Sequence, residues 1–282
     1  EKVGGSEKSF VEKMKQKLSE WGIQSPHLIN ATGLNTQTIS GDPDGKGDEN
    51  QLSAYDIAVI AKHLLQDFPE VTKYTSKPTA LFSNTQIENP NLMLEGMPNY
   101  RSGVDGLRVS NSTKGGITFA ASTTQNGIHM ITVVLGVEAV DGDPYARFVA
   151  TSSLMNYVVR TFVSSIVVKE GDPYGKSKAT VMDGKSETVL AVAKKDFYIV
   201  EKQGSQAEPK IQFKSNQESF RAPVKSGTNL GKLHYTDPDK IGRGYLEDQE
   251  PTVDMVSGRT IEKSFFLKVW WNEFVRYVNE KL

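Results

Sequence analysis

Cysteine is absent from all 282 residues of this chain, which excludes disulfide bonds, a thiolate nucleophile and cysteine-ligated zinc. The chain also lacks a run of about 18 apolar residues, so no segment is expected to cross a bilayer as a helix. Basic and acidic residues nearly balance, 33 against 34, and the formal net charge of -1 predicts no general attraction to nucleic acid. A hydrophobic content of 37% and a charged content of 24% fit a globular protein rather than a disordered one.

Signatures of nucleotide and metal binding are absent as well. No G-x-x-x-x-G-K-[ST] motif occurs, so no phosphate-binding loop is expected. Four acidic residues crowd one glycine-rich loop: Asp42, Asp44, Asp48 and Glu49. Their spacing departs from that of an EF-hand, because no glutamate stands at the twelfth position. We expect this loop to be solvated, and the chain to bind neither a metal ion nor a cofactor.

Local signals predict helices and a hairpin in the first part of the chain. Ser6 is a plausible N-cap of a helix that ends near Gly22, and Ser53 with Asp56 fits a capping box that opens a second helix. Strands 116–122 and 130–137 are joined through an Asn-Gly pair, which is a strong hairpin signal.

A third helix is expected to begin near Pro144 and to run to about residue 162, because proline is favoured in the first helical turn. Its spacing of apolar residues predicts one buried face. The members of that face are Phe148, Leu154, Met155, Val158 and Phe162.

The composition changes near Val163. From there to about Gly258 the chain shows short β-type runs punctuated by glycine, proline and asparagine, which indicates a second, all-β domain. The clearest runs are 165–168, 188–192, 197–200, 210–213 and 232–235.

An amphipathic helix is predicted from Ile261 to Leu282. At about 100° per residue, one arc of this helix is apolar and rich in aromatic rings. That arc consists of Leu267, Trp270, Trp271, Phe274, Tyr277, Val278 and Leu282. Polar side chains lie opposite, among them Lys268, Asn272 and Arg276. Tryptophan and tyrosine favour the headgroup region, so the pattern is typical of a helix that lies on a membrane, and the alternative is a helix that packs its apolar face on its own domain.

Several stretches together resemble one enzyme family. Gly103 to Gly116 follow the frame Gly-x-Asp-Gly-Leu-Lys-Thr-Gly-x-Thr-x-x-Ala-Gly of the low-molecular-mass penicillin-binding D-alanyl-D-alanine carboxypeptidases. Further similar stretches are 10–34 with its turn at 30–34, 52–56, 93–98, 144–148, 150–155 and 265–272. The resemblance spans nearly the whole chain.

The resemblance implies a fold and a function. The fold would be α/β, with part of a penicillin-recognising serine transpeptidase-like domain at residues 1–162, an all-β sandwich-like domain at 163–258 and an amphipathic membrane-associating helix at 259–282. The function would be serine-type carboxypeptidase cleavage of peptidoglycan stem peptides, with sensitivity to β-lactams. The location would be the cell wall, at the extracellular face of the bacterial cytoplasmic membrane.

The chain departs from the family at its reactive groups. The nucleophile and base of this chemistry come from an S-x-x-K motif, aided by S-x-N, and neither motif occurs here. The family's Lys-Thr-Gly triplet has become Arg108-Val109-Ser110. Arginine is bulkier than lysine, valine lacks the hydroxyl of threonine, and Ser110 adds a side chain where glycine allows close approach. We therefore expect a degenerate substrate-binding strand and no catalytic residue within this chain.

Two interpretations follow from these departures. In the first, the chain is the back part of a carboxypeptidase, inactive without an N-terminal segment that is supplied in cis or in trans. In the second, it is a non-catalytic, membrane-associated cell-envelope protein, a decayed paralogue. An intact S-x-x-K motif in the reading frame before Glu1 would favour the first interpretation.

Overall fold

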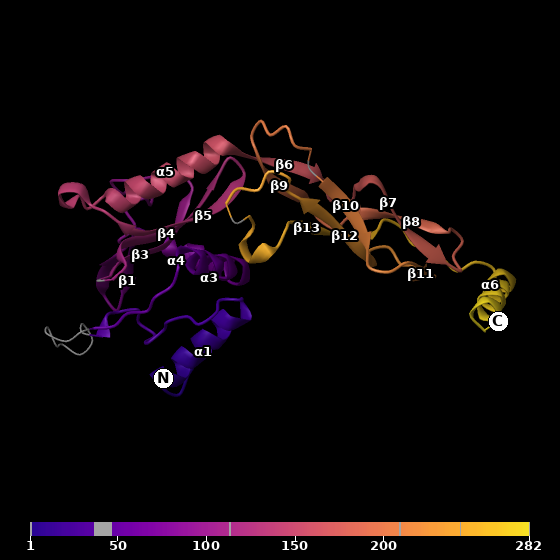
Figure 1. Ribbon diagram of the computed structural model, residues 1–282, viewed down its shortest axis with the longest axis horizontal. Coiled ribbons are helices and arrows are strands. Elements are labelled where there is room, and N and C mark those ends of the chain that lie inside the picture. Colours follow the sequence, from indigo (N-terminus) through magenta and orange to yellow (C-terminus); the bar gives the residue numbers. More distant parts are fainter. Residues whose placement is uncertain (1, 37–46, 113, 209, 243, 282) are drawn as a thin grey trace. The chain divides into compact units, whose positions relative to one another are not determined.

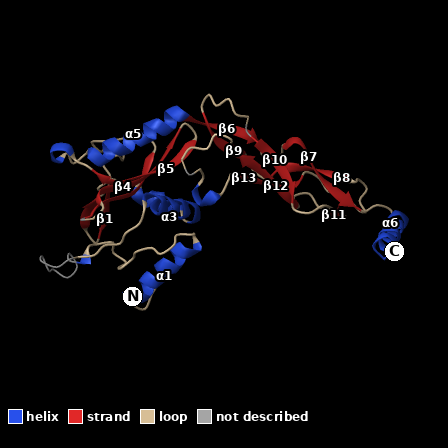
Figure 2. Cartoon of the chain, in the orientation of Figure 1, coloured by secondary structure: helices blue, strands red, loops and turns tan. Residues whose placement is uncertain are grey.

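The computed structural model describes residues 2–36, 47–112, 114–208, 210–242 and 244–281. The chain forms two compact units, Glu1–Thr161 and Phe162–Leu282, and each has its own packed interior (Figure 1). The first unit contains both helices and strands, whereas the second is made of strands followed by one terminal helix (Figure 2). An α/β region followed by a β-rich domain and a C-terminal helix is the fold class that the sequence predicts.

The first unit is built around a three-stranded antiparallel sheet with the order β3-β4-β5. The sheet consists of β3 (Val104–Ser112), β4 (Gly116–Gln125) and β5 (Ile128–Val137). Helix α5 (Ala146–Thr161) covers one face and helix α3 (Ala54–Asp67) lies on the other (Figure 1). Phe119 of β4 meets Phe148 of α5 edge to face, with 5.5 Å between ring centroids. The sheet is therefore a rigid platform for β3, which forms one of its edges.

The described part of this unit contains further elements outside the three-stranded sheet and its two covering helices. They are α1 (Glu7–Glu20), η1 (Pro69–Val71), α4 (Thr72–Thr75), β1 (Thr79–Phe82), β2 (Thr85–Glu88) and η2 (Val140–Gly142). The capping predictions are confirmed: the side chain of Ser6 accepts a hydrogen bond from the N–H of Ser9, and Ser53 and Asp56 form a reciprocal capping box. The Asn-Gly hairpin is confirmed too, since Asn126 and Gly127 both adopt the positive φ of a tight turn.

Helix α5 differs in part from the predicted burial pattern. Phe148 and Met155 are buried as expected, at 3% and 0% exposure. The prediction for Leu154 is wrong, because its side chain is 43% exposed. Leu154 lies one residue, and so about 100°, from Met155 around the helix, and Thr151 occupies the buried position instead. Phe162 is already the first residue of the next strand.

The second unit contains a six-stranded sheet with the order β10-β12-β13-β8-β7-β11, and a separate two-stranded sheet of β6 and β9. The strands are β6 (Phe162–Val168), β7 (Pro173–Met182), β8 (Thr188–Ala193), β9 (Phe197–Lys202), β10 (Lys210–Ser215), β11 (Phe220–Arg221), β12 (Asn229–Thr236) and β13 (Thr252–Ser257). One hydrophobic core joins them, and Leu230, Leu233 and Met255 are fully buried within it. A short 3-10 turn, η3 (Leu246–Asp248), precedes β13.

The chain ends in helix α6 (Phe266–Lys281). This helix begins later than the sequence predicts, because Ile261 belongs to the β core. Ile261 is 4% exposed and pairs with Val224 in an antiparallel bridge with hydrogen bonds in both directions. The amphipathic pattern thus starts only after the chain has completed the core of the β domain.

Candidate functional site

The triplet Arg108-Val109-Ser110 lies on β3, the edge strand of the first unit's sheet. Arg108 pairs with Ala120 and Ser110 with Thr118 of β4. Because side chains alternate along a strand, Arg108 and Ser110 lie on one side and Val109 on the other. Arg108 and Ser110 are exposed, whereas Val109 is half-buried. The position that the sequence assigns to a substrate-binding strand is thus an accessible sheet edge.

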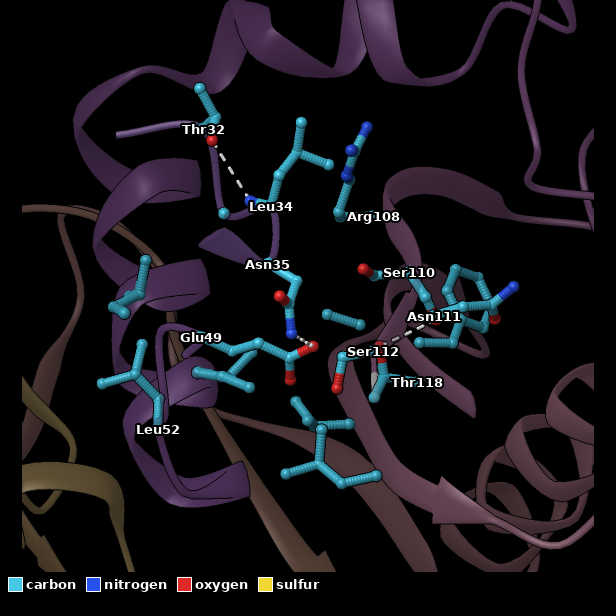
Figure 3. Close-up of a pocket in the computed structure, with 17 residues that line it drawn as sticks. Thr32, Leu34, Asn35, Glu49, Leu52, Arg108, Ser110, Asn111, Ser112 and Thr118 are labelled. Atoms are coloured by element: carbon cyan, nitrogen blue, oxygen red, sulfur yellow. Dashed lines mark hydrogen bonds between the residues drawn. The ribbon is translucent and has the colours of Figure 1, made fainter. Parts of the chain in front are cut away.

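A cavity of about 650 Å³ opens beside this side of β3. Figure 3 shows Leu34, Asn35 and Glu49 on one side of it, and Arg108 and Ser110 on the other. Much of the lining is apolar and comes from Leu52, Ile57, Ile60, Phe119, Val133 and Leu135. The cavity therefore combines an apolar floor with a cation and several hydroxyl and amide groups at its edge, the composition typical of small-molecule sites.

Arg147 of α5 holds the end of β3 in place. Its guanidinium donates to the backbone oxygens of Ser110 (2.9 Å) and Thr118 (3.1 Å), and to the side-chain oxygen of Asn111. The residue is 7% exposed, and this burial lowers the pKa of the guanidinium from its ordinary value. The sequence includes Arg147 in a stretch similar to the family but gives no sign of this role, because its partners lie 29 to 37 residues away.

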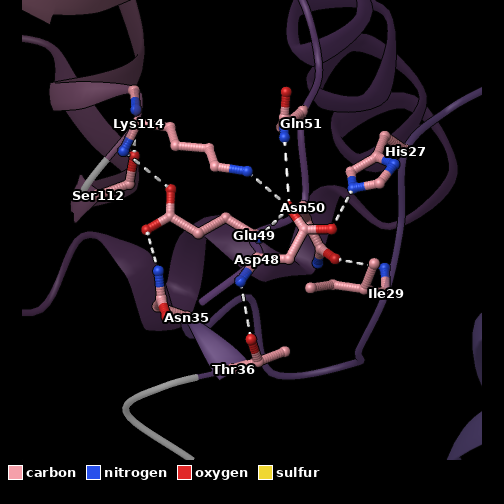
Figure 4. Close-up of polar contacts among 11 residues, drawn as sticks. His27, Ile29, Asn35, Thr36, Asp48, Glu49, Asn50, Gln51, Ser112 and Lys114 are labelled. Atoms are coloured by element: carbon pink, nitrogen blue, oxygen red, sulfur yellow. Dashed lines mark hydrogen bonds and ion pairs between the residues drawn. The ribbon is translucent and has the colours of Figure 1, made fainter. Parts of the chain in front are cut away.

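A polar cluster beside the cavity ties the turn after β3 to the segment before α3 (Figure 4). The Nζ of Lys114 lies 2.8 Å from Oδ1 of Asp48, and the Nε2 of His27 lies 2.8 Å from Oδ2. The pKa of Asp48 is held well below its usual range by Lys114, by the backbone N–H of Glu49 and by His27. The buried Glu49 accepts hydrogen bonds from the backbone N–H of Lys114 and the side chain of Asn35. These contacts fix one wall of the cavity.

Only part of the acidic loop that contains Asp42, Asp44, Asp48 and Glu49 lies within the described residues. Asp42 and Asp44 lie outside the described residues, while Asp48 and Glu49 are engaged by the cations and amides just named. Within the described ranges, no group of three or more histidine and acidic side chains is arranged to hold a metal ion.

Helix α6 presents its aromatic side to solvent. Four of its residues are between 48% and 61% exposed: Trp270, Trp271, Phe274 and Tyr277. Leu267 is 55% exposed and Val278 is half-buried. The helix does not pack this side on its own domain. No helix among the residues that the structure describes is long and apolar enough to cross a membrane.

Comparison with known proteins identifies relatives of both units. Residues 1–139 match the peptidase S11 family, D-alanyl-D-alanine carboxypeptidase, and residues 162–263 match the C-terminal domain of penicillin-binding protein 5. The D-alanyl-D-alanine carboxypeptidase DacA of Haemophilus influenzae is 27% identical over 237 residues, which are 83% of this chain and 55% of that protein. The chain spans about half the length of the curated relatives that it matches.

Solved structures agree with this assignment. A peptidoglycan synthesis regulatory factor (PBP3) from Streptococcus pneumoniae is 45% identical, with a TM-score of 0.87, over 93% of this chain and 72% of that one. Penicillin-binding protein 5 of Haemophilus influenzae shares the fold at 23% identity, with a TM-score of 0.60 over 90% of this chain and 66% of that one. The chain therefore belongs to the D-alanyl-D-alanine carboxypeptidase family of penicillin-binding proteins.

Proposed function

We propose that this chain is the part of a serine-type D-alanyl-D-alanine carboxypeptidase that supplies the substrate-binding strand and the membrane-associating helix. The observation that carries the proposal is the position of Arg108 and Ser110 on an accessible sheet edge, along a cavity of about 650 Å³. An extended peptide end or a β-lactam can lie against such an edge, and a guanidinium is a good partner for a terminal carboxylate. The substrate class is the stem peptide of peptidoglycan.

By itself the chain has no hydrolytic activity in this proposal. No serine in the sequence is followed by lysine at the third position, so the S-x-x-K nucleophile and base are not available within these 282 residues. Loss of the nucleophile in a serine hydrolase costs several orders of magnitude in rate. The altered triplet weakens binding further, since the bulky guanidinium of Arg108 and the added side chain of Ser110 both line the cavity.

Labelling with a fluorescent penicillin tests the proposal. The purified chain is incubated with the reagent, denatured and separated by mass, with an active carboxypeptidase of the family as the positive control. We expect no fluorescent band at 31.1 kDa. A covalent band at that mass would mean that another residue of this chain acts as the nucleophile, and the proposed inactivity would be wrong.

Activity in this proposal requires an N-terminal segment, in cis or in trans, that carries S-x-x-K and S-x-N. The apolar part of the cavity lining supports this, because Ile57 and Ile60 of α3 and Val133 of β5 offer a surface on which such a segment can pack, and the β3 side of the cavity is left for the substrate. Co-expression with the S-x-x-K-bearing segment of the pneumococcal relative is the direct test. We expect a soluble complex and a penicillin adduct on the added segment, whereas the segment alone should give none.

The second candidate function is that of a non-catalytic envelope protein. The replacement of Lys-Thr-Gly by Arg108-Val109-Ser110 favours it, because these changes affect binding even where a nucleophile is present. The co-expression experiment distinguishes the two functions. A well-folded complex that forms no penicillin adduct would favour the non-catalytic protein.

Membrane association through α6 is the other half of the proposal. Exposed Trp270, Trp271 and Tyr277 on one side of a terminal helix are suited to the headgroup region of a bilayer. This arrangement would hold the carboxypeptidase domain at the outer face of the cytoplasmic membrane, next to the cell wall. The matching experiment is binding to lipid vesicles, with substitution of the aromatic side chains.

A further inference from the structure

The turn that follows β7 contains a buried carboxylate that binds α6. The side chain of Asp183 is 1% exposed, and its oxygens accept hydrogen bonds from three side chains. Arg276 donates through both terminal nitrogens, the shortest contact being 2.9 Å from Nη2 to Oδ2. Asn272 and Arg221 complete the set, each at 3.4 Å. Two of these three partners belong to α6, one turn apart on the same side of the helix.

A second ion pair extends this contact. Arg221 of β11 bonds Glu273 of α6 as well as Asp183, so that negative and positive groups alternate along the contact. The backbone reinforces it, because the N–H of Ser264 donates to the carbonyl of Asp183 at 2.8 Å, and Gly184 pairs with Lys263. The chain is thus held where it enters α6 and again at the second and third turns of the helix.

These contacts favour one rotation of α6 about its own axis. A carboxylate removed from water is costly unless it is paired and hydrogen-bonded, and a guanidinium fork is the partner that satisfies both of its oxygens. Rotating α6 to bury Trp271 or Phe274 against the domain would withdraw Arg276 and Asn272 from Asp183. The contact therefore favours the orientation in which the polar side of α6 faces the domain.

We propose that Asp183 is the positioning residue of the lipid-facing helix: it clamps the polar side of α6 to the β domain and so presents the aromatic side to a membrane surface. The inference rests on the proposed membrane association, and it identifies Asp183 as the residue that orients α6 for that contact. Because the helix is ordered before it meets lipid, binding need not include the free-energy cost of forming and turning it.

Substitution of Asp183 by asparagine is the test. Asp183 has a φ of 60°, which asparagine adopts readily, so that Asp183→Asn removes the charge and keeps both the size and the backbone conformation. Asp248→Asn is the matched control, because Asp248 also has a positive φ, of 53°, in the same unit and is exposed. Amide hydrogen exchange of α6 is measured in solution, and binding is measured to vesicles of equal parts phosphatidylglycerol and phosphatidylcholine.

We expect α6 to exchange about tenfold faster or more in Asp183→Asn, while β8, β12 and β13 keep their protection. If the fraction of molecules that hold α6 in this orientation falls to about one tenth, the affinity for vesicles falls about tenfold. Asp248→Asn should match the unchanged protein in both measurements. Unchanged exchange and unchanged affinity in Asp183→Asn would overturn the clamp.

A second variant keeps the test decisive if Asp183→Asn does not fold. Arg276→Gln removes the main partner from the exposed helix and leaves the β core untouched, and the same two changes are expected. Failure of the two proposals can be told apart. If the unchanged protein does not bind vesicles, membrane association is wrong, while hydrogen exchange in solution still decides whether Asp183 holds the helix.

Discussion

The cavity beside β3 and the aromatic side of α6 differ in whether this chain contains every group that the function proposed for each surface requires. The cavity has a shaped apolar floor and a cation, Arg108, but the chain holds no S-x-x-K serine to react with what the cavity binds. The proposed membrane contact of α6 requires no further group, since its aromatic side chains are exposed and its polar side is bonded to the β domain.

The difference shows that binding and chemistry have different structural requirements. The proposed membrane contact depends on area and orientation, which one helix and one buried carboxylate can provide. Acyl transfer depends on a nucleophile and a base in mutual contact, so the absence of one motif removes the reaction while the fold remains. The two surfaces can therefore be altered separately by substitution.

The largest effect is expected from restoring the triplet. In the complex with an S-x-x-K-bearing segment, the triple variant Arg108→Lys, Val109→Thr and Ser110→Gly should be acylated by penicillin about 10²- to 10³-fold faster, the range typical of a single oxyanion donor. The rate is followed by stopped labelling on gels. Val109→Ile is the matched control, because it changes shape without adding a hydroxyl, and it should give no gain. Equal rates for the triple variant and the original would show that the triplet does not limit the reaction.

The next largest effect is expected on the stability of the first unit, when a buried side chain of α5 is shortened. Met155→Ala removes a fully buried side chain of α5 and should lower the free energy of unfolding of the first unit by about 3 kcal/mol. Leu154→Ala, one residue away and 43% exposed, should cost less than about 1 kcal/mol. Urea denaturation followed by circular dichroism measures both. Similar losses for the two variants would contradict the burial pattern of α5.

A smaller effect on free energy is expected at the membrane surface. Trp271→Ala should weaken vesicle binding about tenfold, because a large aromatic side chain can no longer enter the interface. Tyr198→Ala is the control, since Tyr198 is 57% exposed, much like the 58% of Trp271, but lies on β9. Neither change should alter thermal unfolding appreciably. If Tyr198→Ala weakened binding as much as Trp271→Ala, the surface of α6 would not be the membrane contact.

The smallest effect is expected on how the stability of the first unit depends on pH, through Asp48 at the wall of the cavity. The pKa of Asp48 is lower in the folded chain than in the unfolded one, chiefly through Lys114. The unfolded chain therefore takes up the proton first, so the contribution of Asp48 is complete above about pH 4 and is lost as the pH falls through the folded pKa. Urea midpoints of the first unit between pH 6 and pH 3 should fall less steeply in Asp48→Asn. Identical slopes would mean that the contact with Lys114 does not stabilise the fold.

Much of the fold could be predicted because its signals are local. The capping box of Ser53 and Asp56 spans four residues, and the Asn-Gly turn fixes the hairpin of β4 and β5. The sequence gives only a weak signal for strand β7, because its buried positions include Ser177 and Ala179, which give little hydrophobic alternation. The start of α6 differs from the prediction because Ile261 forms an isolated β-bridge with Val224, which is distant in the sequence.

The site was predictable only in outline. The frame around Val104-Asp105-Gly106-Leu107 predicts where a substrate-binding strand would lie, since it resembles a known family along a continuous stretch, and the structure forms strand β3 there. The supporting residues gave no such signal. Arg147 bonds to residues about 30 positions away, and Asp183 meets Arg276 across 93 positions. Such pairs are set by tertiary packing, which a single sequence does not reveal.

Release of D-alanine from a stem pentapeptide by the purified 282-residue chain tests the central claim most directly. With no nucleophile in the chain, we predict release no faster than in buffer alone, and no change after addition of penicillin. Release that exceeds the buffer rate and is abolished by penicillin would contradict the account, because the chain would then contain a reactive residue that its sequence does not disclose.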